Sequence, residues 1–137
     1  MAQVWLVTGS SRGLCRAIVE AGLAAGNKVL ATARDIKSLR DLAERYGNEI
    51  KVFALDVTNE AAADAVKTAI DAFGSLDVVI NNAGYGNLSS VEDTPMSDFR
   101  AQIETNLFGT IIVTKHRDAI RRSGNRGREI ATPGQKR

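Results

Sequence analysis

The 137-residue sequence is poor in the residue types that mark specialised protein classes, with one cysteine, two prolines and 5% aromatic residues. A single cysteine, Cys15, cannot form an internal disulfide, which excludes a disulfide-stabilised scaffold and is typical of a reducing compartment. No apolar run approaches the roughly 18 residues that a membrane-spanning helix needs. The first residues also lack the basic segment and the cleavage site of a secretory signal. We therefore expect a cytoplasmic protein without a membrane partner.

The composition is otherwise that of a globular protein of one domain, with 44% hydrophobic and 25% charged residues. Charge is distributed unevenly, although the net charge is only +2. Residues 1–114 carry 10 basic and 14 acidic side chains, whereas residues 115–137 carry 8 basic and 2 acidic ones. The second segment has no aromatic residue and few large aliphatic ones, so it buries too little apolar surface to offset its ordering entropy. We expect a folded domain over residues 1–115 and a basic tail over residues 116–137 that is disordered or not native.

Apolar runs and amphipathic stretches alternate along residues 1–114, which predicts parallel strands covered by helices on both faces of one sheet. Strands are predicted at residues 4–8, 28–33, 51–55 and 77–80. Helices are predicted at residues 13–25, 38–46 and 61–73, and from Pro95 to about residue 114. The predicted fold class is therefore α/β, with a doubly wound parallel sheet that is truncated after about four strands.

A glycine-rich turn, residues 8–15 (Thr-Gly-Ser-Ser-Arg-Gly-Leu-Cys), joins the first strand to the first helix. Gly9 allows the backbone to turn tightly, and Gly13 opens the helix, whose free N–H groups carry the positive end of the helix dipole. The serine and arginine side chains between the two glycines are able to donate to phosphate oxygens. The turn is predicted to bind phosphate; the alternative is a purely structural turn.

A glycine-rich turn between a strand and a helix is typical of sites for dinucleotides such as NAD and NADP, and the end of the second strand indicates which of the two would bind. An acidic residue usually follows this strand and accepts a hydrogen bond from the adenosine ribose, but here the position holds Ala33. The next residue, Arg34, suits a ribose 2′-phosphate, which favours NADP over NAD. The alternative is a solvated arginine whose charge Asp35 neutralises.

Polar residues also follow the third and fourth strands. Asp56-Val57 closes the third strand, and Asn81-Asn82-Ala83-Gly84 closes the fourth. The carboxyl ends of parallel strands share one edge of the sheet, so these loops and the glycine-rich turn are expected to meet in one crevice. Taken singly, Asp56 could instead be an acid at a helix N-terminus and the asparagines could be turn formers.

Together, these motifs resemble the short-chain dehydrogenase/reductase family, and the resemblance extends from Val4 to about Lys115. Residues 8–13 are similar to the family's TGxxxGxG cofactor turn, Asp56-Val57 to its adenine-contacting pair, and residues 81–84 to its NNAG strand end. Asn106 is similar to the asparagine of the family's catalytic tetrad. The resemblance implies a Rossmann-type NAD(P)-binding domain and hydride transfer between NADP(H) and a carbonyl or alcohol substrate.

The resemblance also implies roles for individual residues. The glycine-rich turn would contact the pyrophosphate and its ribose, Arg12 and Arg34 would hold the 2′-phosphate, and Asn82 would brace the central sheet. Asn106 is the one catalytic residue that the resemblance assigns, and no metal site is predicted. The residues predicted to bind the cofactor are Thr8, Gly9, Ser11, Arg12, Gly13, Leu14, Arg34, Asp56, Val57, Asn81, Asn82, Ala83 and Gly84.

The sequence departs from the family pattern in three places. Cys15 stands where the third glycine is expected; it is interpreted as a small packing residue, the alternative being a thiol with a lowered pKa at the helix N-terminus. The family's catalytic serine and Tyr-x-x-x-Lys pair are missing, because Tyr46 and Tyr85 have Ile50 and Ser89 four positions on. Residues 116–137 lack the apolar helix end and the fifth strand that the family would have.

These departures leave more than one functional hypothesis. The first is an NADP-dependent oxidoreductase of this family whose chain, as a truncated or frame-shifted reading of a longer gene, transfers no hydride by itself. The second is a non-enzymatic dinucleotide-binding module or an inactive fragment, in which Asn106 only kinks its helix. Nucleic acid is a disfavoured partner, since the basic tail has no interleaved aromatic residue. A homo-oligomer is a property of the family that the missing segment puts in doubt here.

Overall fold

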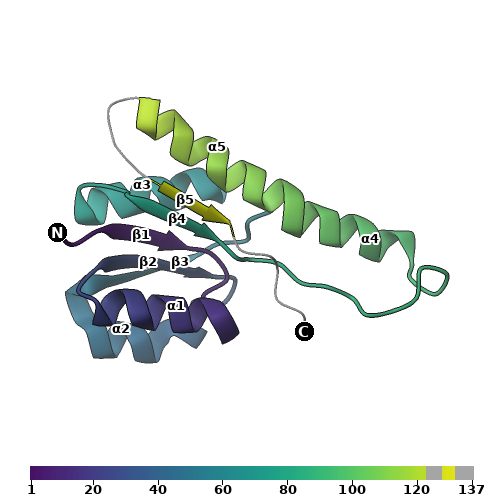
Figure 1. Cartoon of the computed structure of the whole chain (residues 1–137), viewed down its shortest axis with the longest axis horizontal. Helices are drawn as coiled ribbons and strands as arrows, with labels where there is room; N and C mark the ends of the chain where they lie inside the picture. Colours follow the sequence, from purple (N-terminus) through teal and green to yellow (C-terminus); the bar gives the residue numbers. More distant parts are fainter. Residues whose placement is uncertain (123–127, 132–137) are drawn as a thin grey trace.

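The computed structural model describes residues 1–122 and 128–131. Five parallel strands form one sheet in the order β3-β2-β1-β4-β5 (Figure 1). The strands are β1 (Val4–Val7), β2 (Lys28–Ala33), β3 (Ile50–Ala54), β4 (Val78–Asn81) and β5 (Arg128–Ala131). The chain adds β2 and β3 on one side of β1 and then returns to add β4 on the other side. The strand order therefore reverses between β1 and β4, which is where open sheets of this kind bind ligands.

Helices cover both faces of the sheet, as Figure 1 shows. The helices are α1 (Gly13–Ala24), α2 (Arg40–Tyr46), α3 (Ala61–Phe73), α4 (Met96–Ile103) and α5 (Gly109–Arg122), with the short segments η1 (Ile36–Leu39), η2 (Gly47–Glu49) and the π-helical turn η3 (Glu104–Phe108). α1 and α2 lie against one face, and α3 and α5 lie against the other. This arrangement confirms the predicted α/β fold of the Rossmann type.

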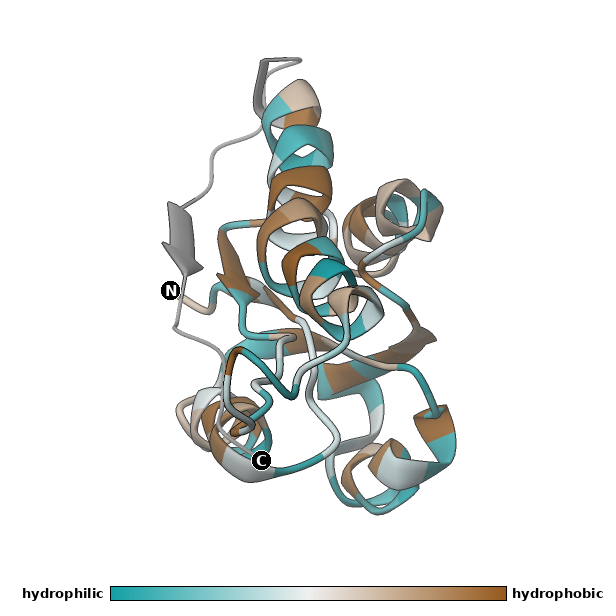
Figure 2. Cartoon of the chain, turned by 90° about the vertical axis from the view of Figure 1, so that its right-hand side faces the viewer, coloured by the Kyte–Doolittle hydropathy of each residue, from teal (hydrophilic) through white to brown (hydrophobic). Residues whose placement is uncertain are grey.

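Each face of the sheet has its own hydrophobic core. Leu6 of β1 packs into the core under α3 and α5, and its neighbour Val7 packs into the core under α1 and α2. This alternation is the two-residue period of a strand, and here both sides are buried. It explains why the strands read as continuous apolar runs. Figure 2 shows the same contrast, with brown strands between helices that carry both brown and teal residues.

The predicted end of the folded domain near Lys115 is wrong. α5 continues to Arg122, and β5 pairs in parallel with β4 over Val78–Asn81. The prediction relied on the basic composition of residues 115–137. Charged side chains on the solvent side of a helix do not prevent its opposite side from packing on the sheet. A strand of only four residues also has little effect on the average composition of this segment. The tail predicted to be disordered at residues 123–127 and 132–137 lies outside the described residues.

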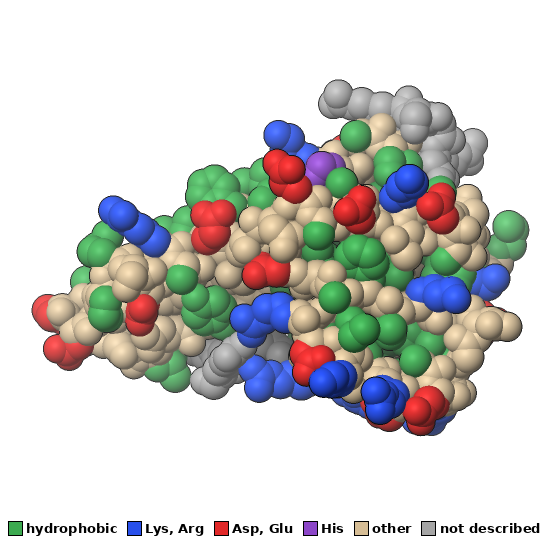
Figure 3. Space-filling model, turned by 180° about the vertical axis from the view of Figure 1, so that it is seen from behind, with side chains coloured by type: hydrophobic (Ala, Val, Ile, Leu, Met, Phe, Trp, Pro, Cys, Tyr) green, Lys and Arg blue, Asp and Glu red, His purple; other side chains and the backbone are tan. Residues whose placement is uncertain are grey.

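α4, η3 and α5 follow one another without a break and form one long helical arm (Figure 1). Large hydrophobic side chains on this arm face the solvent, and green side chains are visible at the end of the molecule that carries α4, on the left of Figure 3. They are Met96, Ile103, Leu107, Phe108 and Ile111. This apolar surface has no counterpart on α3, whose large hydrophobic side chains pack toward the sheet.

A charged side chain lies inside the row of buried residues on α5. Gly109, Val113 and Arg117 follow one another at four-residue spacing, and Arg117 is only 7% exposed. Its Nη1 donates to Asp118 Oδ1 at 3.0 Å, while its buried Nη2 has no hydrogen-bond partner within the part of the chain that the structure describes. Burying a polar atom without a partner costs free energy.

Arg117→Leu is therefore expected to raise the free energy of unfolding by about 1 kcal/mol, because leucine is apolar and the substitution removes the buried nitrogen that has no partner. Urea denaturation followed by circular dichroism measures the change. Asp118→Asn is the matched control and should change stability by less than about 0.5 kcal/mol, because asparagine keeps the Oδ1 that accepts from Arg117 and the carboxylate that it replaces is partly exposed. A clearly less stable Leu variant would contradict the prediction.

Candidate functional site

A cavity of about 530 Å³ opens at the carboxyl ends of the strands, beside the point where the strand order reverses. Its lining residues are Gly9, Ser11, Arg12, Gly13, Ala33, Arg34, Leu55, Asp56, Val57, Asn82, Ala83, Gly84, Tyr85 and Thr105. The glycine-rich turn, the end of β2 and the segments after β3 and β4 thus meet as predicted. Its volume is in the range of small-molecule sites.

The glycine-rich turn requires its first glycine for two reasons. Gly9 has a φ of 68°, in the left-handed region that side chains disfavour. A Cβ at this position would also lie 3.0 Å from Ala83 Cα and 3.2 Å from Ala83 N, so the turn packs directly on the segment after β4. Ser10, expected from the sequence to face a phosphate, is fully buried and donates to the Val7 carbonyl at 2.8 Å. The polar groups that reach the cavity from this turn come from Ser11 onward.

The N-terminus of α1, where the first backbone N–H groups have no partner within the helix, lies at the cavity. Gly13 is its first residue, and the preceding Arg12 makes no side-chain cap to the helix. The first turn contains no acidic residue that would neutralise the positive end of the helix dipole. Gly13 and Arg12 both line the cavity, so an anion there would meet backbone donors and a guanidinium together.

Cys15 is a packing residue and not an activated thiol. Its side chain is completely buried against the core under α1. Burial raises the pKa of the Cys15 thiol to about 12, and a hydrogen bond with the Asn82 side chain lowers it by less. The alternative of a thiol with a lowered pKa is therefore wrong: desolvation outweighs the favourable field of the helix N-terminus.

Thr8 is a hub of hydrogen bonds behind the cavity. Its Oγ1 accepts from the backbone N–H groups of Asn82 and Ala83, both at 3.1 Å, and donates to the Ile80 carbonyl at 3.4 Å. The hydroxyl thereby joins the end of β1 to the segment that follows β4. Thr8 is buried and does not itself line the cavity, so its place in the site is structural.

Two other predicted cofactor residues also lie away from the cavity lining. Leu14 is 48% exposed on α1, and Asn81 is buried at the end of β4. The Asn81 Nδ2 donates to Thr114 Oγ1 at 3.3 Å, and Thr114 Oγ1 donates to the Thr110 carbonyl at 2.7 Å. Asn81 thus joins β4 to α5. A sequence pattern identifies the loop that carries a site, but it does not tell which side chains of that loop turn inward.

Two arginines, Arg12 and Arg34, and the carboxylate of Asp56 are among the residues that line the cavity. Neither Arg12 nor Arg34 forms an ion pair within 4.0 Å among the described residues. The Asp35 carboxylate, which could have neutralised Arg34, instead accepts from the Lys37 backbone N–H at 2.9 Å. Asp56 accepts from both the backbone N–H and the hydroxyl of Thr58, at 2.9 and 2.6 Å. These bonds, followed by the nearby charge of Arg34, hold the pKa of the Asp56 carboxyl below its usual range.

Asn106 lies in the π-helical turn η3 and binds the backbone of Tyr85. Its Oδ1 accepts from the Tyr85 N–H at 3.0 Å, and its Nδ2 donates to the Tyr85 carbonyl at 2.7 Å. Both amide atoms are thus used to hold the segment after β4, while its neighbour Thr105 and Tyr85 line the cavity. One turn earlier, Gln102 Oε1 accepts from the Asn87 N–H at 3.3 Å. Two amide side chains therefore attach the helical arm to the segment that follows β4, and one of the two contacts, Asn106 with Tyr85, is at the cavity wall.

Four residues of the lining are not among the residues predicted to bind the cofactor or to be catalytic. They are Ala33, Leu55, Tyr85 and Thr105. Each is a direct neighbour in the chain of a residue that was predicted, so the signal was present in the motifs. Alanine and leucine at the ends of strands are typical of core positions, and Ala33 and Leu55 are indeed buried, so their place in the cavity lining depends on how the chain turns after each strand.

A family model of short chain dehydrogenases matches residues 3–131 of this chain. The chain therefore belongs to the short-chain dehydrogenase family. The match includes the second half of α5 and the strand β5, which lie beyond the limit of the resemblance near Lys115 that the sequence motifs had indicated.

Several known proteins are similar to the chain. It is 51% identical over 118 residues to oxidoreductase BOA17 of Botryotinia fuckeliana, which covers 84% of this chain and 43% of that protein. It is 38% identical to the uncharacterised oxidoreductase YusZ of Bacillus subtilis, covering 82% and 42% of the two chains. A crystal structure of a short-chain dehydrogenase from Streptomyces avermitilis has a TM-score of 0.88 and 34% identity, covering 95% of this chain and 48% of that one. The chain thus spans less than half the length of these relatives.

The described residues contain neither a candidate metal site nor a candidate membrane-spanning helix. Among them, no group of three or more histidine, cysteine or acidic side chains is placed to hold a metal ion. Nor is any helix in residues 1–122 of sufficient length and apolar character to cross a membrane.

Proposed function

We propose that the cavity binds a nicotinamide dinucleotide and that it prefers NADP(H) to NAD(H). We further propose that the chain is the cofactor-binding part of an oxidoreductase that acts on a carbonyl or alcohol substrate. The preference rests on one observation: Arg12 and Arg34 both line the cavity, and neither has an ion-pair partner among the described residues. Arginine groups left unpaired at a cavity suit a phosphate, which offers them several charged acceptors at once.

The remaining lining fits the other parts of such a ligand. The free N–H groups at the start of α1 would hold the pyrophosphate. Gly9 packs closely on Ala83 and has no side chain that could obstruct the pyrophosphate. Leu55, Asp56 and Val57 would hold the adenine at the end of β3. When bound, the dinucleotide supplies the hydride donor or acceptor, and this chain supplies its binding and orientation.

Related proteins support the ligand class. ElxO, whose structure was solved with NADPH bound, has a TM-score of 0.87 and 26% identity to this chain. A 3-ketoacyl-(acyl-carrier-protein) reductase from Brucella melitensis was solved with NADH, with a TM-score of 0.83 and 26% identity. Because both kinds of dinucleotide occur among these relatives, the preference for NADP(H) proposed here depends on Arg12 and Arg34.

The second part of the proposal concerns catalysis by these 137 residues. Asn106 is the only member of the family's catalytic set that the motifs identify, and its side-chain amide is engaged with the Tyr85 backbone. Neither Tyr46 nor Tyr85 is followed by a lysine at the fourth position. We therefore propose that these residues alone bind the dinucleotide without transferring a hydride, which favours a non-enzymatic binding module as the second candidate. Consumption of NADPH with a panel of carbonyl compounds would overturn this part.

The cofactor preference is tested by titrating the chain with NADPH and NADH and following the fluorescence of the reduced nicotinamide. NADPH should bind more tightly than NADH. Arg34→Leu is expected to weaken NADPH binding about tenfold and to leave NADH within about twofold, because one charge-assisted contact to the 2′-phosphate is lost. Lys37→Leu is the matched control, since it removes an exposed cation from η1 that does not line the cavity. Equal affinities for both dinucleotides would refute the preference, and a folded chain that binds neither would refute the proposal.

A further inference from the structure

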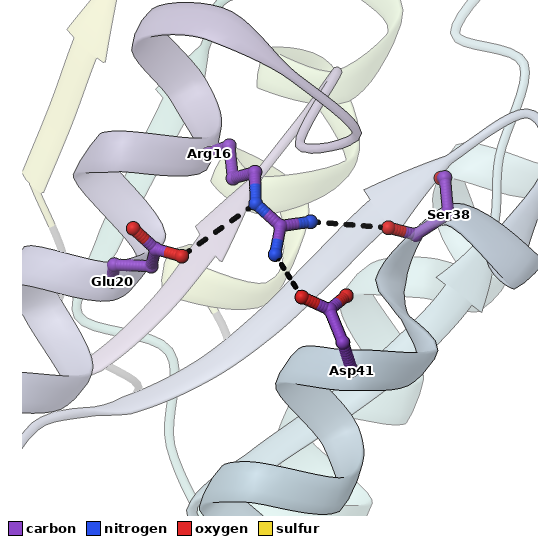
Figure 4. A network of polar contacts seen from close by, with 4 residues as sticks. All are labelled: Arg16, Glu20, Ser38 and Asp41. Atoms are coloured by element: carbon purple, nitrogen blue, oxygen red, sulfur yellow. Dashed lines mark hydrogen bonds and ion pairs between the residues drawn. The ribbon is translucent and has the colours of Figure 1, made fainter.

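Arg16 connects the two segments that supply arginines to the cavity. It lies on α1, one turn after Arg12 and Gly13, and reaches across to the segment that follows Arg34 (Figure 4). Its Nη1 donates to the Ser38 carbonyl at 3.2 Å, and its Nη2 pairs with Asp41 Oδ2. One guanidinium thus binds a backbone carbonyl of η1 and a carboxylate in the first turn of α2.

A third contact of Arg16 stays within its own helix. Its Nε lies 3.5 Å from Glu20 Oε1, four residues further along α1. Two carboxylates therefore surround Arg16, whereas Arg12 and Arg34 have no ion-pair partner among the described residues. The charge of Arg16 is already compensated, so this residue is not itself a phosphate ligand, and its contacts to Ser38 and Asp41 set the spacing of two segments.

Ser38 is joined by hydrogen bonds to Asp35, the residue next to Arg34. The Ser38 hydroxyl and backbone N–H both donate to the Asp35 carbonyl, at 2.6 and 3.3 Å, and Asp35 directly follows Arg34. The Asp35 carboxylate accepts from the Lys37 N–H. The turn from residue 35 to 38 is therefore a compact unit, and Arg16 attaches this unit to α1.

Exposed ion pairs of this kind contribute little to overall stability, since water screens them and both side chains lose freedom. They do limit the relative movement of the segments that they join. A binding site whose charged groups are already in place loses less entropy when the ligand arrives, so the benefit appears in affinity.

We propose that Arg16, through Ser38 and Asp41, is a positioning residue that holds the Arg34 segment at a fixed spacing from Arg12 and thereby sets the affinity of the cavity for a ribose 2′-phosphate. The inference rests on the proposed function, because it concerns the same cavity and the same phosphate. It assigns a role in ligand discrimination to a residue that does not line the cavity.

Two nucleotides that differ only in this phosphate test the inference. Adenosine 2′,5′-bisphosphate and adenosine 5′-monophosphate are titrated by calorimetry into the 137-residue chain and its variants. Arg16→Gln and Asp41→Asn should each weaken bisphosphate binding about threefold to tenfold and leave the monophosphate within about twofold. The double variant should bind the bisphosphate no more weakly than Arg16→Gln alone, because Arg16→Gln already breaks the contact that Asp41→Asn removes. Glu20→Gln is the matched control: it removes a carboxylate from Arg16 within α1, keeps the link to α2, and should change neither affinity.

The outcomes separate this inference from the proposed function. A wild-type chain that binds both nucleotides equally would refute the proposed NADP(H) preference, and the inference with it. A wild-type chain that prefers the bisphosphate, with the same preference in Arg16→Gln and Asp41→Asn, would refute the inference alone. An equal loss of affinity for both nucleotides would also refute it, because the contact would then act only on folding. Thermal melts of each variant establish that the compared chains are folded, and Arg16→Lys, which keeps the charge but not the planar fork, should lose part of the preference.

Discussion

Thr8→Val is expected to lower the free energy of unfolding by about 2 to 4 kcal/mol, the largest change among the substitutions considered for this protein. Valine keeps the shape of threonine but has no oxygen to accept from the N–H groups of Asn82 and Ala83, which Thr8 Oγ1 binds at 3.1 Å. Thr8 and Asn82 are buried, at 1% and 4% exposure, so water does not replace the lost acceptor for the Asn82 N–H. Each buried donor left without a partner costs about 1 to 3 kcal/mol.

Urea denaturation of Thr8→Val beside Thr8→Ser isolates the hydroxyl. Serine keeps the oxygen and loses one methyl group, so its cost should stay near 1 kcal/mol. The valine variant should also lose affinity for NADPH, since Ala83 and Gly84 line the cavity and their segment is no longer tied to β1. If valine were tolerated as well as serine, the hub of hydrogen bonds at Thr8 would have no energetic role.

Gly109→Ala is the second substitution with a large expected effect, a loss of about 2 kcal/mol of stability. Gly109 begins α5 directly after the π-helical turn and lies against the segment that follows β3. A Cβ here would stand 2.5 Å from Val57 Cγ2 and 3.1 Å from Val57 Cβ, which is too close for a branched side chain to absorb. At a solvent-exposed position within a helix, glycine to alanine would stabilise the protein by up to about 1 kcal/mol. A loss of stability in Gly109→Ala would therefore report the clash with Val57.

A second substitution tests whether Val57 is the cause. Val57→Ala removes the Cγ2 methyl group that the new Cβ would meet at 2.5 Å and keeps the Cβ at 3.1 Å, so Gly109→Ala should cost clearly less stability in that background. Denaturation of the four proteins of this cycle gives the coupling between the two sites. Because Val57 lines the cavity, Gly109→Ala alone should also weaken dinucleotide binding. An equal loss of stability in both backgrounds would show that the strain arises elsewhere on the helix.

The parts of the fold that the sequence predicted are those with local causes. β2 and α3 begin and end at the predicted residues, because glycine, asparagine and the apolar pattern act within a few positions of each boundary. The two glycines of the first turn were informative for the same reason. A left-handed backbone at the junction of a strand and a helix is a local requirement, and Gly9 and Gly13 meet it with φ values of 68° and 63°.

The features that escaped prediction depend on partners distant in the chain. Asn106 pairs with Tyr85, 21 positions away, and Gly109 lies against Val57. Ser10 is an exception, because its hydroxyl donates to the Val7 carbonyl, which is only three residues away. Arg117 reads as a solvated cation in a basic stretch, yet helical spacing from Val113 places it in the buried row. A sequence pattern gives the type of each element, and tertiary packing then selects which side chains are enclosed.

The pairing of β4 with its two neighbours has a consequence for how the chain folds. Leu6 pairs with Val79 across 73 positions, and Val79 pairs with Glu129 across a further 50. Contacts between such distant positions form slowly, because the chain loses the entropy of closing the long loop before the strand pairing contributes favourable free energy. During synthesis, β1 and β2 are complete long before β4 emerges, so the backbone groups of β1 that will bind β4 stay open to other chains. The strand at the centre of the finished sheet is thus an edge strand for much of its assembly, and the yield of native protein depends on how soon residues 78–81 reach it.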